Sequence, residues 1–401
     1  MAKKTNTIPQ IKKEDWVSNF TLIGRAKIND YTFKIDEKAE KSDWIYNSMN
    51  LGVDCGEKHG TVYAEMMGGY ADERENVIYA HGKTDDGKDD FENKITVDWD
   101  DRDNEDVLDT IGDLCFITVG LETTTKDKKT FYKKFLSAYD AIAYINEHLD
   151  NDTVVNVKGT MKYSMYNDKV QVRKNITSIV LSKVDDESKF KATFNQTVLL
   201  DKSSASLKNI DKDKSAMYVD AKVLDYVKEI NGVEIKGQYP YNVQFEYVFP
   251  DLSNQEQVKK IMDKLFKVKK NITQVTFEGE FIEGGAVVQA TLDDIPQDIK
   301  DLIDIGVYTE EEALARCSSN GARERRMVLT KPFIRLVGDD KIPVPQIFAD
   351  KFKEEDLIFN IPESTSDDDD DTDDTVNTVE DDDDDDENED SGTDTSWLDS
   401  L

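Results

Sequence analysis

The chain has 401 residues with 85 acidic and 51 basic side chains, which gives a formal net charge of −34 at pH 7. No apolar run approaches the roughly 20 residues needed to cross a bilayer, and no apolar stretch follows the basic start, as a secretory signal would require. Three widely spaced cysteines (Cys55, Cys115 and Cys317) form neither a disulfide framework nor a metal knuckle. We therefore predict a protein of the reducing cytoplasm without a membrane segment.

The first part of the chain, between about Phe20 and Lys183, alternates apolar and polar residues with a period of two. Its β-branched and aromatic residues in this pattern predict strands with one buried face. One helix interrupts the strands: Ile142, Ile145 and Leu149 recur at helical spacing, and Ser137 is placed to cap the first turn.

Two further strands follow this helix and form a closing hairpin. Strands, then one helix, then a hairpin is the order typical of a small Greek-key barrel of the OB type. Residues 190–345 repeat this plan, with a helix from Asn254 to about Lys267, an insertion of two short helices within 293–317 and a closing strand near Arg326–Leu329.

The predicted fold is mainly β with a few helices (α+β): two tandem OB-like barrels followed by a disordered acidic tail. The predicted segments, in chain order, are an N-terminal arm at 1–18, a first OB-like domain at 19–184, a second OB-like domain at 189–345 with its helical insertion at 293–317, a connector at 346–361 and the tail at 362–401.

The tail has an unusual composition. From Pro362 to Leu401 it contains 20 Asp or Glu residues and no Lys, Arg or His, so it cannot bury enough apolar surface to fold. It nevertheless ends in an apolar tip, Trp397, Leu398 and Leu401. A purely solubilising tail does not need such a tip, whereas a binding motif would use the acids to approach a basic pocket and the apolar side chains as anchors.

Signals of enzymatic chemistry are absent from the sequence. There is no glycine-rich phosphate loop after a strand, and no histidine has a neighbouring ligand at metal-binding spacing. The acidic run Asp98–Asp106 lacks the glycine and terminal glutamate of a calcium loop, so a solvated loop is the better interpretation. We predict no catalytic residues, no metal and no cofactor.

Nucleic-acid binding has indirect support from the closing hairpin of the first unit. OB barrels bind single strands by stacking bases on aromatic side chains beside a groove of Lys and Arg. The hairpin offers both kinds of residue: Lys158, Lys162, Tyr163, Tyr166, Lys169, Arg173 and Lys174. The alternative is that these are ordinary exposed charges on a half-buried hairpin.

Other basic and aromatic residues also qualify as contacts, each with a plainer alternative. Lys133 and Lys134 alternate with aromatic residues in a strand that could equally serve the core. Three arginines of the second unit, Arg323, Arg325 and Arg326, would suit a loop that grips the phosphate backbone. Several lysines from Lys259 to Lys270 lie on or just after the second helix, where a solvated helix face is the plainer interpretation. We assign four aromatic residues to barrel packing before stacking: Trp44, Tyr46, Tyr63 and Tyr79.

With its strand–helix–strand units and its tail from Asp381 to Leu401, the sequence resembles the single-stranded DNA-binding proteins of bacteria and their phages. The acidic body and two-unit length are more similar to phage-encoded versions, which would place the protein in the host cytoplasm. The resemblance implies that Trp397, Leu398 and Leu401, with the acids of 381–394, dock replication, recombination and repair proteins and compete with DNA for the basic groove. The tip departs from the bacterial pattern, which ends in Pro-Phe, so its partner pocket would differ.

The leading hypothesis is thus a non-enzymatic protein that binds single-stranded DNA without sequence preference during phage DNA replication and recombination. The alternative is an acidic interaction protein that mimics DNA and inhibits a nucleic-acid-binding enzyme of the host. The sequence leaves open the oligomeric state, the site size and which barrel binds DNA.

Overall fold

A computed structural model describes most of the chain up to residue 359, with gaps. The described ranges are residues 9, 11–124, 129–166, 169–184, 186–212, 215–230, 232–284, 287–288, 297–304, 309, 319–320, 324–338 and 341–359. Strands dominate these ranges and helices are few, which confirms the mainly-β prediction. No helix in the described ranges is long and apolar enough to span a membrane. The acidic tail lies outside the described residues.

Five strands of the first unit form a closed barrel. They are β1 (Ser18–Lys27), β3 (Trp44–Asp54), β4 (Thr61–Ala71), β10 (Lys169–Leu181) and β9 (Val154–Tyr166). Each pairs with the next in this order, and β9 pairs back with β1. Only the β4–β10 contact, at Glu65 and Asn175, is parallel among these pairs. The OB-like barrel predicted for this unit is therefore present.

Helix α2 (Ala138–His148) closes one end of this barrel where the sequence placed a helix. The Ser137 side chain accepts a hydrogen bond from the Tyr139 amide at 3.1 Å, as expected of an N-cap. Ile142 and Ile145 are fully buried in the barrel core. The Asn47 amide donates to the Tyr139 carbonyl at 2.8 Å and ties the helix to β3.

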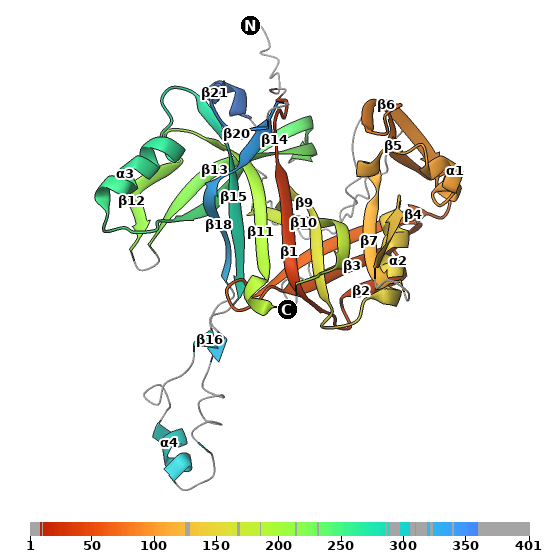
Figure 1. Ribbon diagram of the computed structural model, residues 1–401, viewed down its shortest axis with the longest axis horizontal. Helices are drawn as coiled ribbons and strands as arrows, with labels where there is room; N and C mark the ends of the chain where they lie inside the picture. The colour runs from red at the N-terminus through yellow and green to blue at the C-terminus, as the bar shows by residue number, and fades with distance from the viewer. Residues whose placement is uncertain are drawn as a thin grey trace.

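A small lobe is inserted between β4 and α2. Its elements are β5 (Val77–Lys83), β6 (Asp89–Asp98), η1 (Trp99–Asp101), α1 (Glu105–Leu108), η2 (Asp113–Cys115), β7 (Ile117–Thr123) and β8 (Thr130–Phe135). Strands β5 and β6 pair in a sheet of their own, whereas β7 joins the barrel through β10. Val97, Ile111, Phe116 and Leu136 give the lobe a separate small core. Strands β5 and β6 and helix α1 of the lobe lie on the side of the first barrel that is away from the second unit, at the right of Figure 1.

The second unit repeats the cyclic strand order of the first. Its strands, each paired with the next, are β11 (Lys191–Leu200), β13 (Ala216–Ile230), β14 (Val233–Val248), β18 (Glu324–Pro332) and β15 (Ile272–Gly284). The β14–β18 pair is again parallel, and β11 meets β13 at Leu199 and Lys222. Helix α3 (Gln255–Ile261) and the π-helical turn η4 (Met262–Phe266) precede β15, where the sequence predicted a helix.

The remaining elements extend or flank the two rings. They are β2 (Phe33–Lys38), η3 (Glu187–Lys189), β12 (Ala205–Asp211), β16 (Val287–Val288), α4 (Gln297–Asp304), β17 (Ser319–Asn320), β19 (Ile334–Val337), β20 (Ile342–Pro345), β21 (Ile347–Phe352) and η5 (Glu354–Leu357). Helix α4 lies in the segment predicted as a helical insertion and stands apart from the barrels (Figure 1). Strand β21 lies within the predicted connector and pairs with β15.

The two units are joined along β1 and β11, which lie side by side at the centre of Figure 1. These strands pair antiparallel from Ser18↔Gln196 to Ile23↔Lys191, so that fifteen strands of the described chain form one continuous sheet. Phe20 faces Phe194 across this pair, and both are buried in a single core that contains residues of both units. The two units are therefore packed together and not separated by an open linker.

Buried polar contacts reinforce this junction. The Lys174 ammonium on β10 lies 2.7 Å from the Glu283 carboxylate on β15, and their side chains are only 11% and 5% exposed. Asp225 on β13 accepts from the Tyr163 amide at 2.7 Å and from Lys13 at 3.2 Å. In each case, a charge from one unit is neutralised by a group of the other or of the N-terminal arm.

We predict that Lys174→Met lowers the free energy of unfolding by roughly 3–5 kcal/mol, because it leaves the Glu283 carboxylate buried without its cation. Adding Glu283→Gln should restore part of this loss. The matched control is Lys331→Met, since the Lys331–Glu278 pair is 67% and 36% exposed and should contribute no more than about 1 kcal/mol. Urea unfolding measures all three variants, and equal losses for Lys174→Met and Lys331→Met would contradict the prediction.

Candidate nucleic-acid interface

The β9–β10 hairpin separates its predicted contact residues onto two faces. Along β9, Val155, Val157 and Tyr163 point into the core, whereas Lys158 is exposed on the opposite face. At the tip, Tyr166 is 46% exposed and pairs in register with the exposed Lys169. Lys158, Tyr166 and Lys169 are thus accessible to a ligand.

The structure also brings Lys134 onto the outer face that carries Lys158. Lys158 is opposite Ser178 on β10, Ser178 is opposite Thr118 on β7, and Thr118 is opposite Lys134 on β8. The two lysines therefore share one row across four strands. Lys134 contacts the exposed Asp113 at 3.0 Å, so part of its charge is balanced locally.

Lys133 takes the other face of β8 and lies over aromatic rings. Its ammonium is 4.7 Å from the Tyr144 ring centroid and 5.0 Å from that of Phe135. Burial and the nearby Glu122 carboxylate raise the pKa of Tyr144 to about 12, so its phenol stays neutral at physiological pH. Lys133 is consequently a cation held above a half-buried aromatic group.

Two predicted contacts are buried inside the molecule. Tyr163 is 3% exposed, and its hydroxyl donates to Gln196 at 3.1 Å, so a base could stack on its ring only if the core opened. Lys174 is held by Glu283 and lies 4.8 Å from the Phe281 ring centroid. Neither is therefore part of an accessible surface that could bind a nucleic acid.

The other predicted cations lie beside carboxylates. Lys162 is 3.9 Å from Asp225, and the Arg173 guanidinium is 3.8 Å from Glu65. Arg326 binds both carboxylate oxygens of Glu246 through Nε and Nη2. These contacts reduce the charge that each residue can offer to a phosphate.

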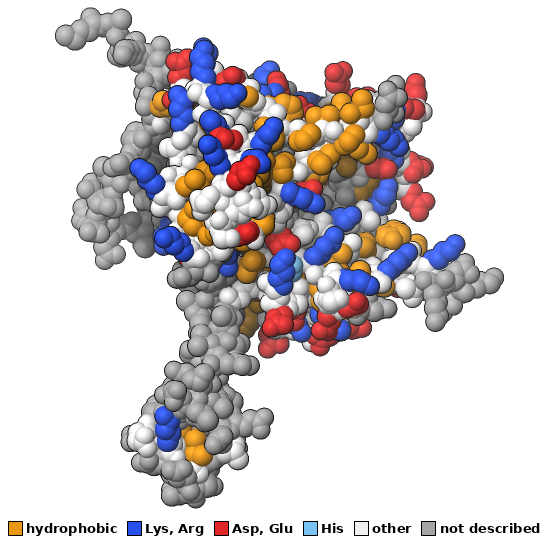
Figure 2. Space-filling view, turned by 60° about the vertical axis from the view of Figure 1, so that its left-hand side comes forward, with side chains coloured by type: hydrophobic (Ala, Val, Ile, Leu, Met, Phe, Trp, Pro, Cys, Tyr) orange, Lys and Arg blue, Asp and Glu red, His pale blue; other side chains and the backbone are white. Residues whose placement is uncertain are grey.

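The remaining predicted residues differ in whether the structure describes them. Arg325 is exposed on β18. Arg323 and the tail residues Trp397, Leu398 and Leu401 lie outside the described residues. The lysines around α3 are exposed, and two of them pair with acids one helical turn earlier, Lys260 with Glu256 and Lys267 with Asp263. Figure 2 turns this side of the molecule forward and shows Lys and Arg side chains among exposed hydrophobic groups, with a patch of acids below them.

A more concentrated aromatic surface lies on the outer face of β3 and β4, which we call the β3–β4 outer face. Met49, Leu51 and Val53 point into the barrel, so the alternate residues of β3 point outward. The outward side chains of the two strands are Trp44, Tyr46, Ser48, Asn50, Tyr63, Glu65 and Met67. All seven of these outward side chains are half-buried, so the aromatic groups among them are partly open to solvent.

Two glycines shape this face. Gly69 lies under the Trp44 indole, since a Cβ at this position would be 2.9 Å from Trp44 Nε1. Gly52 is flanked by Tyr63 and Lys27, with a Cβ there falling 3.3 Å from Tyr63 Cε1 and 3.4 Å from Lys27 Cβ. The missing side chains let both rings lie against the sheet. The Trp44 and Tyr46 rings are themselves stacked, with centroids 4.8 Å apart and planes inclined by 16°.

Cations border the β3–β4 outer face. Lys34 on β2 is exposed and opposite Ser48, and Lys27 on β1 is opposite Gly52. Arg173 approaches from β10 beside Glu65. The sequence-based assignment of Trp44, Tyr46 and Tyr63 to barrel packing missed this outward placement. The alternation of these residues with Met49, Leu51 and Val53 was the signal that could have identified it.

The corresponding face of the second unit is different in character. On β13 and β14, Lys222 donates to Asn242 at 2.7 Å and Gln244 donates to Asp220 at 2.8 Å. Tyr218 and Tyr226 are half-buried aromatic residues of this face, opposite Glu246 and Gln238. Paired polar groups thus replace the aromatic cluster of the first unit.

No group of three or more His, Cys, Asp or Glu side chains in the described ranges is arranged to hold a metal ion. The carboxylates of the Asp98–Asp106 run instead take part in a turn and a short helix, where Asn104 caps α1.

Comparisons with known proteins identify a family and a similar solved structure. Among solved structures, the chain is similar to the wild-type single-stranded DNA-binding protein from Thermus aquaticus, with a TM-score of 0.30 and 8% sequence identity over 67% of this chain and 87% of that chain. No curated protein matches the sequence. The YorF family model matches residues 75–282, which is just over half of the chain. The protein therefore belongs to the YorF family.

Proposed function

We propose that this protein binds single-stranded DNA without sequence preference, as a non-enzymatic component of phage DNA replication and recombination. The observation that carries the proposal is the outward clustering of Trp44, Tyr46 and Tyr63 on β3 and β4 of a closed five-stranded barrel. In OB barrels, the corresponding second and third strands provide the face that binds oligonucleotides.

Stacking would supply most of the affinity at this face. Every base has an aromatic face, so stacking on an aromatic side chain contributes roughly 1–3 kcal/mol per base whatever the sequence. The Trp44–Tyr46 pair and the Tyr63 ring lie at opposite ends of the β3–β4 ladder, with Met67 and Asn50 between them. This spacing supports at least two stacked bases, with the intervening chain passing over Met67.

The cations around the face would contact phosphates. Lys34 and Lys27 lie on the flanking strands β2 and β1, and Lys169 and Tyr166 stand at the hairpin tip of β9 and β10. The Lys158–Lys134 row continues the basic surface around the outside of the barrel. In this proposal the phosphate contacts orient the strand and the aromatic side chains hold the bases.

We assign the second unit a supporting role. Its strands repeat the cyclic order of the first, and we interpret the pair as tandem OB barrels. Its β13–β14 face has Lys222, Gln244 and Glu246 already engaged by neighbouring side chains. The first barrel is therefore the better candidate for base contacts, and the second stabilises it through the shared core.

The tail would recruit partners. Its acids would compete with DNA for the cations of the first barrel, and Trp397, Leu398 and Leu401 would anchor in a pocket of a replication or recombination protein. The opposing hypothesis, a DNA mimic, uses the same acidity to occupy an enzyme of the host and predicts no DNA binding at all.

The first test titrates the full chain and its variants with fluorescent oligo-dT at low and moderate salt. We predict that Trp44→Leu and Tyr63→Leu each weaken binding roughly 5- to 150-fold, which corresponds to the loss of about 1–3 kcal/mol of stacking. Tyr218→Leu is the matched control, because it removes an aromatic residue from the equivalent face of the second unit, and it should leave the affinity unchanged.

Two results would contradict the proposal. Absence of oligo-dT binding at both salt concentrations would favour the DNA mimic, particularly if the protein inhibits a nuclease or polymerase. Equal losses for Tyr63→Leu and Tyr218→Leu would reject the β3–β4 outer face as the base-binding surface.

A second test separates the two roles of the tail. Deletion of residues 381–401 should tighten oligo-dT binding at low salt, because it removes acids that compete for the same cations. The variant Trp397→Ala/Leu398→Ala keeps those acids and should bind oligo-dT as the full chain does. An unchanged affinity after the deletion would contradict competition and leave only the recruiting role.

A further inference from the structure

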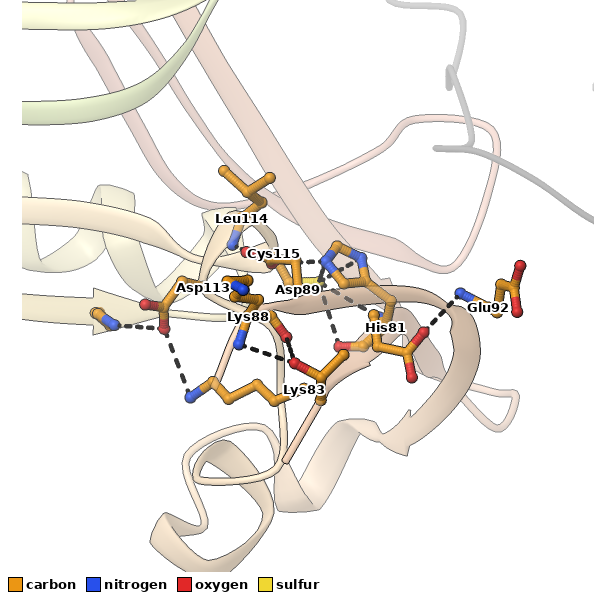
Figure 3. A network of polar contacts seen from close by, with 11 residues as sticks. His81, Lys83, Lys88, Asp89, Glu92, Asp113, Leu114 and Cys115 are labelled. Atoms are coloured by element: carbon orange, nitrogen blue, oxygen red, sulfur yellow. Dashed lines mark hydrogen bonds and ion pairs between the residues drawn. The ribbon is translucent and has the colours of Figure 1, made fainter. Parts of the chain in front are cut away.

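The inserted lobe holds a cysteine, a histidine and an aspartate in one network of polar contacts (Figure 3). Cys115 Sγ lies 3.2 Å from His81 Nδ1, and His81 Nε2 lies 2.7 Å from Asp89 Oδ1. The three residues come from η2, β5 and β6, respectively. A nucleophile within hydrogen-bond reach of a base, and a third group that orients the base, is the arrangement that activates side chains for nucleophilic attack.

The hydrogen bonds assign a role to each nitrogen of His81. Asp89 also accepts from the Leu114 amide at 2.9 Å, and this bond and the His81 contact lower the pKa of Asp89. An ionised Asp89 can only accept, so His81 Nε2 carries a proton and Nδ1 is left as the acceptor that faces the Cys115 thiol. Any imidazolium formed when the thiol loses its proton is stabilised by Asp89.

The surrounding chain holds this geometry in place. Gly112 is required beneath it, because a Cβ there would lie 2.6 Å from both His81 Nε2 and Asp89 Oδ1. The Gly112 amide donates to the His81 carbonyl at 2.8 Å, and the Phe91 ring lies 4.5 Å from the imidazole, centroid to centroid. The side chains of His81 and Asp89 are 17% and 18% exposed, so a small solute can reach them.

Other charged groups near the triad largely balance one another. Lys83 and Lys134 both contact Asp113, at 3.5 and 3.0 Å. Lys94 is opposite His81 in the β5–β6 register, and Asp90 is opposite Gly82. Burial and the nearby Asp89 raise the pKa of the Cys115 thiol, so little thiolate is present at rest and attack requires a base within reach, which His81 Nδ1 provides.

We propose that Cys115 is a site of oxidation by hydroperoxides, with His81 as its base and Asp89 as the residue that positions His81. The Cys115 sulfur attacks one peroxide oxygen as His81 Nδ1 accepts the thiol proton. An S–O bond forms and the O–O bond breaks, and the departing hydroxide takes the proton from His81 to give water. The sulfur is oxidised to a sulfenic acid and the peroxide is reduced.

The test uses the full chain carrying Cys317→Ser, treated with hydrogen peroxide at pH 7 in the presence of dimedone, which traps sulfenic acids. Peptide mass spectrometry then measures the rate at each cysteine. We expect Cys115 to react roughly 100-fold or more faster in the folded protein than in the urea-unfolded chain, as a positioned base would provide. Cys55 is the internal reference, since it is 1% exposed and should not react while the protein is folded.

Variants distinguish a positioned base from simple exposure. Asp89→Asn and His81→Gln should each remove most of the rate advantage. Asp113→Asn is the matched control, because it removes a neighbouring carboxylate whose ion pairs are with Lys83 and Lys134 and not with His81. Circular dichroism and thermal melting are used to check that each variant is folded.

Either of two results would overturn the proposal. One is a Cys115 rate in the folded wild-type chain no greater than in the unfolded chain, a comparison that depends on no variant. The other is an equal effect of Asp89→Asn and Asp113→Asn in folded proteins.

Discussion

Backbone pairing between β1 and β11 is the constraint on which the rest of this structure depends. Six residue pairs, from Ser18↔Gln196 to Ile23↔Lys191, join the part of β1 that β3 leaves unpaired to the part of β11 that β13 leaves unpaired. A strand edge left open would be a template for aggregation, so this pairing protects both rings at once. It also directs Phe20 and Phe194 into one core. The two units therefore share their buried surface and cannot move apart without exposing it.

This shared core explains why a lysine that the sequence suggests is exposed, Lys174, is instead buried in an ion pair. Lys174 and Glu283 are 109 residues apart, and they meet where the two units pack together. A charge at such a junction must be paired, because an isolated ion in a poorly hydrated site is costly. The contact stabilises the packing of the two barrels, and it makes Lys174 unavailable for binding a ligand.

Local patterns predicted much of the fold, since they depend on near neighbours. The Ser137 cap, the buried Ile142 and Ile145, and the alternation along β9 were all predictable from spacing. Contacts between distant segments were not. The same alternation that placed Tyr163 with Val155 already indicated an inward position, and the structure shows that this carried more information than the aromatic character of the residue.

The candidate site was predictable only in part, for a related reason. A period of two tells which residues of a strand share a face, and on β3 it groups Trp44 and Tyr46 with Ser48 and Asn50, opposite Met49 and Leu51. Aromatic character suggested the core, whereas this grouping indicated the outside. Gly52 and Gly69 could not be interpreted without the register that sets them beneath Tyr63 and Trp44.

The net charge of −34 also decides which force can hold an anionic strand on this protein. At physiological ionic strength, the Debye length is about 8 Å, so acids of the body that lie farther than this from the β3–β4 outer face are screened from a strand on that face. Lys34 and Lys27 border this face, but Asp152 contacts Lys27 at 2.8 Å and offsets part of its charge. Few uncompensated cations border this face in the described part of the chain, so the affinity of the proposed complex would come chiefly from stacking. Stacking depends weakly on salt, and a protein built in this way would retain its ligand at ionic strengths that detach a strand held by phosphate contacts alone.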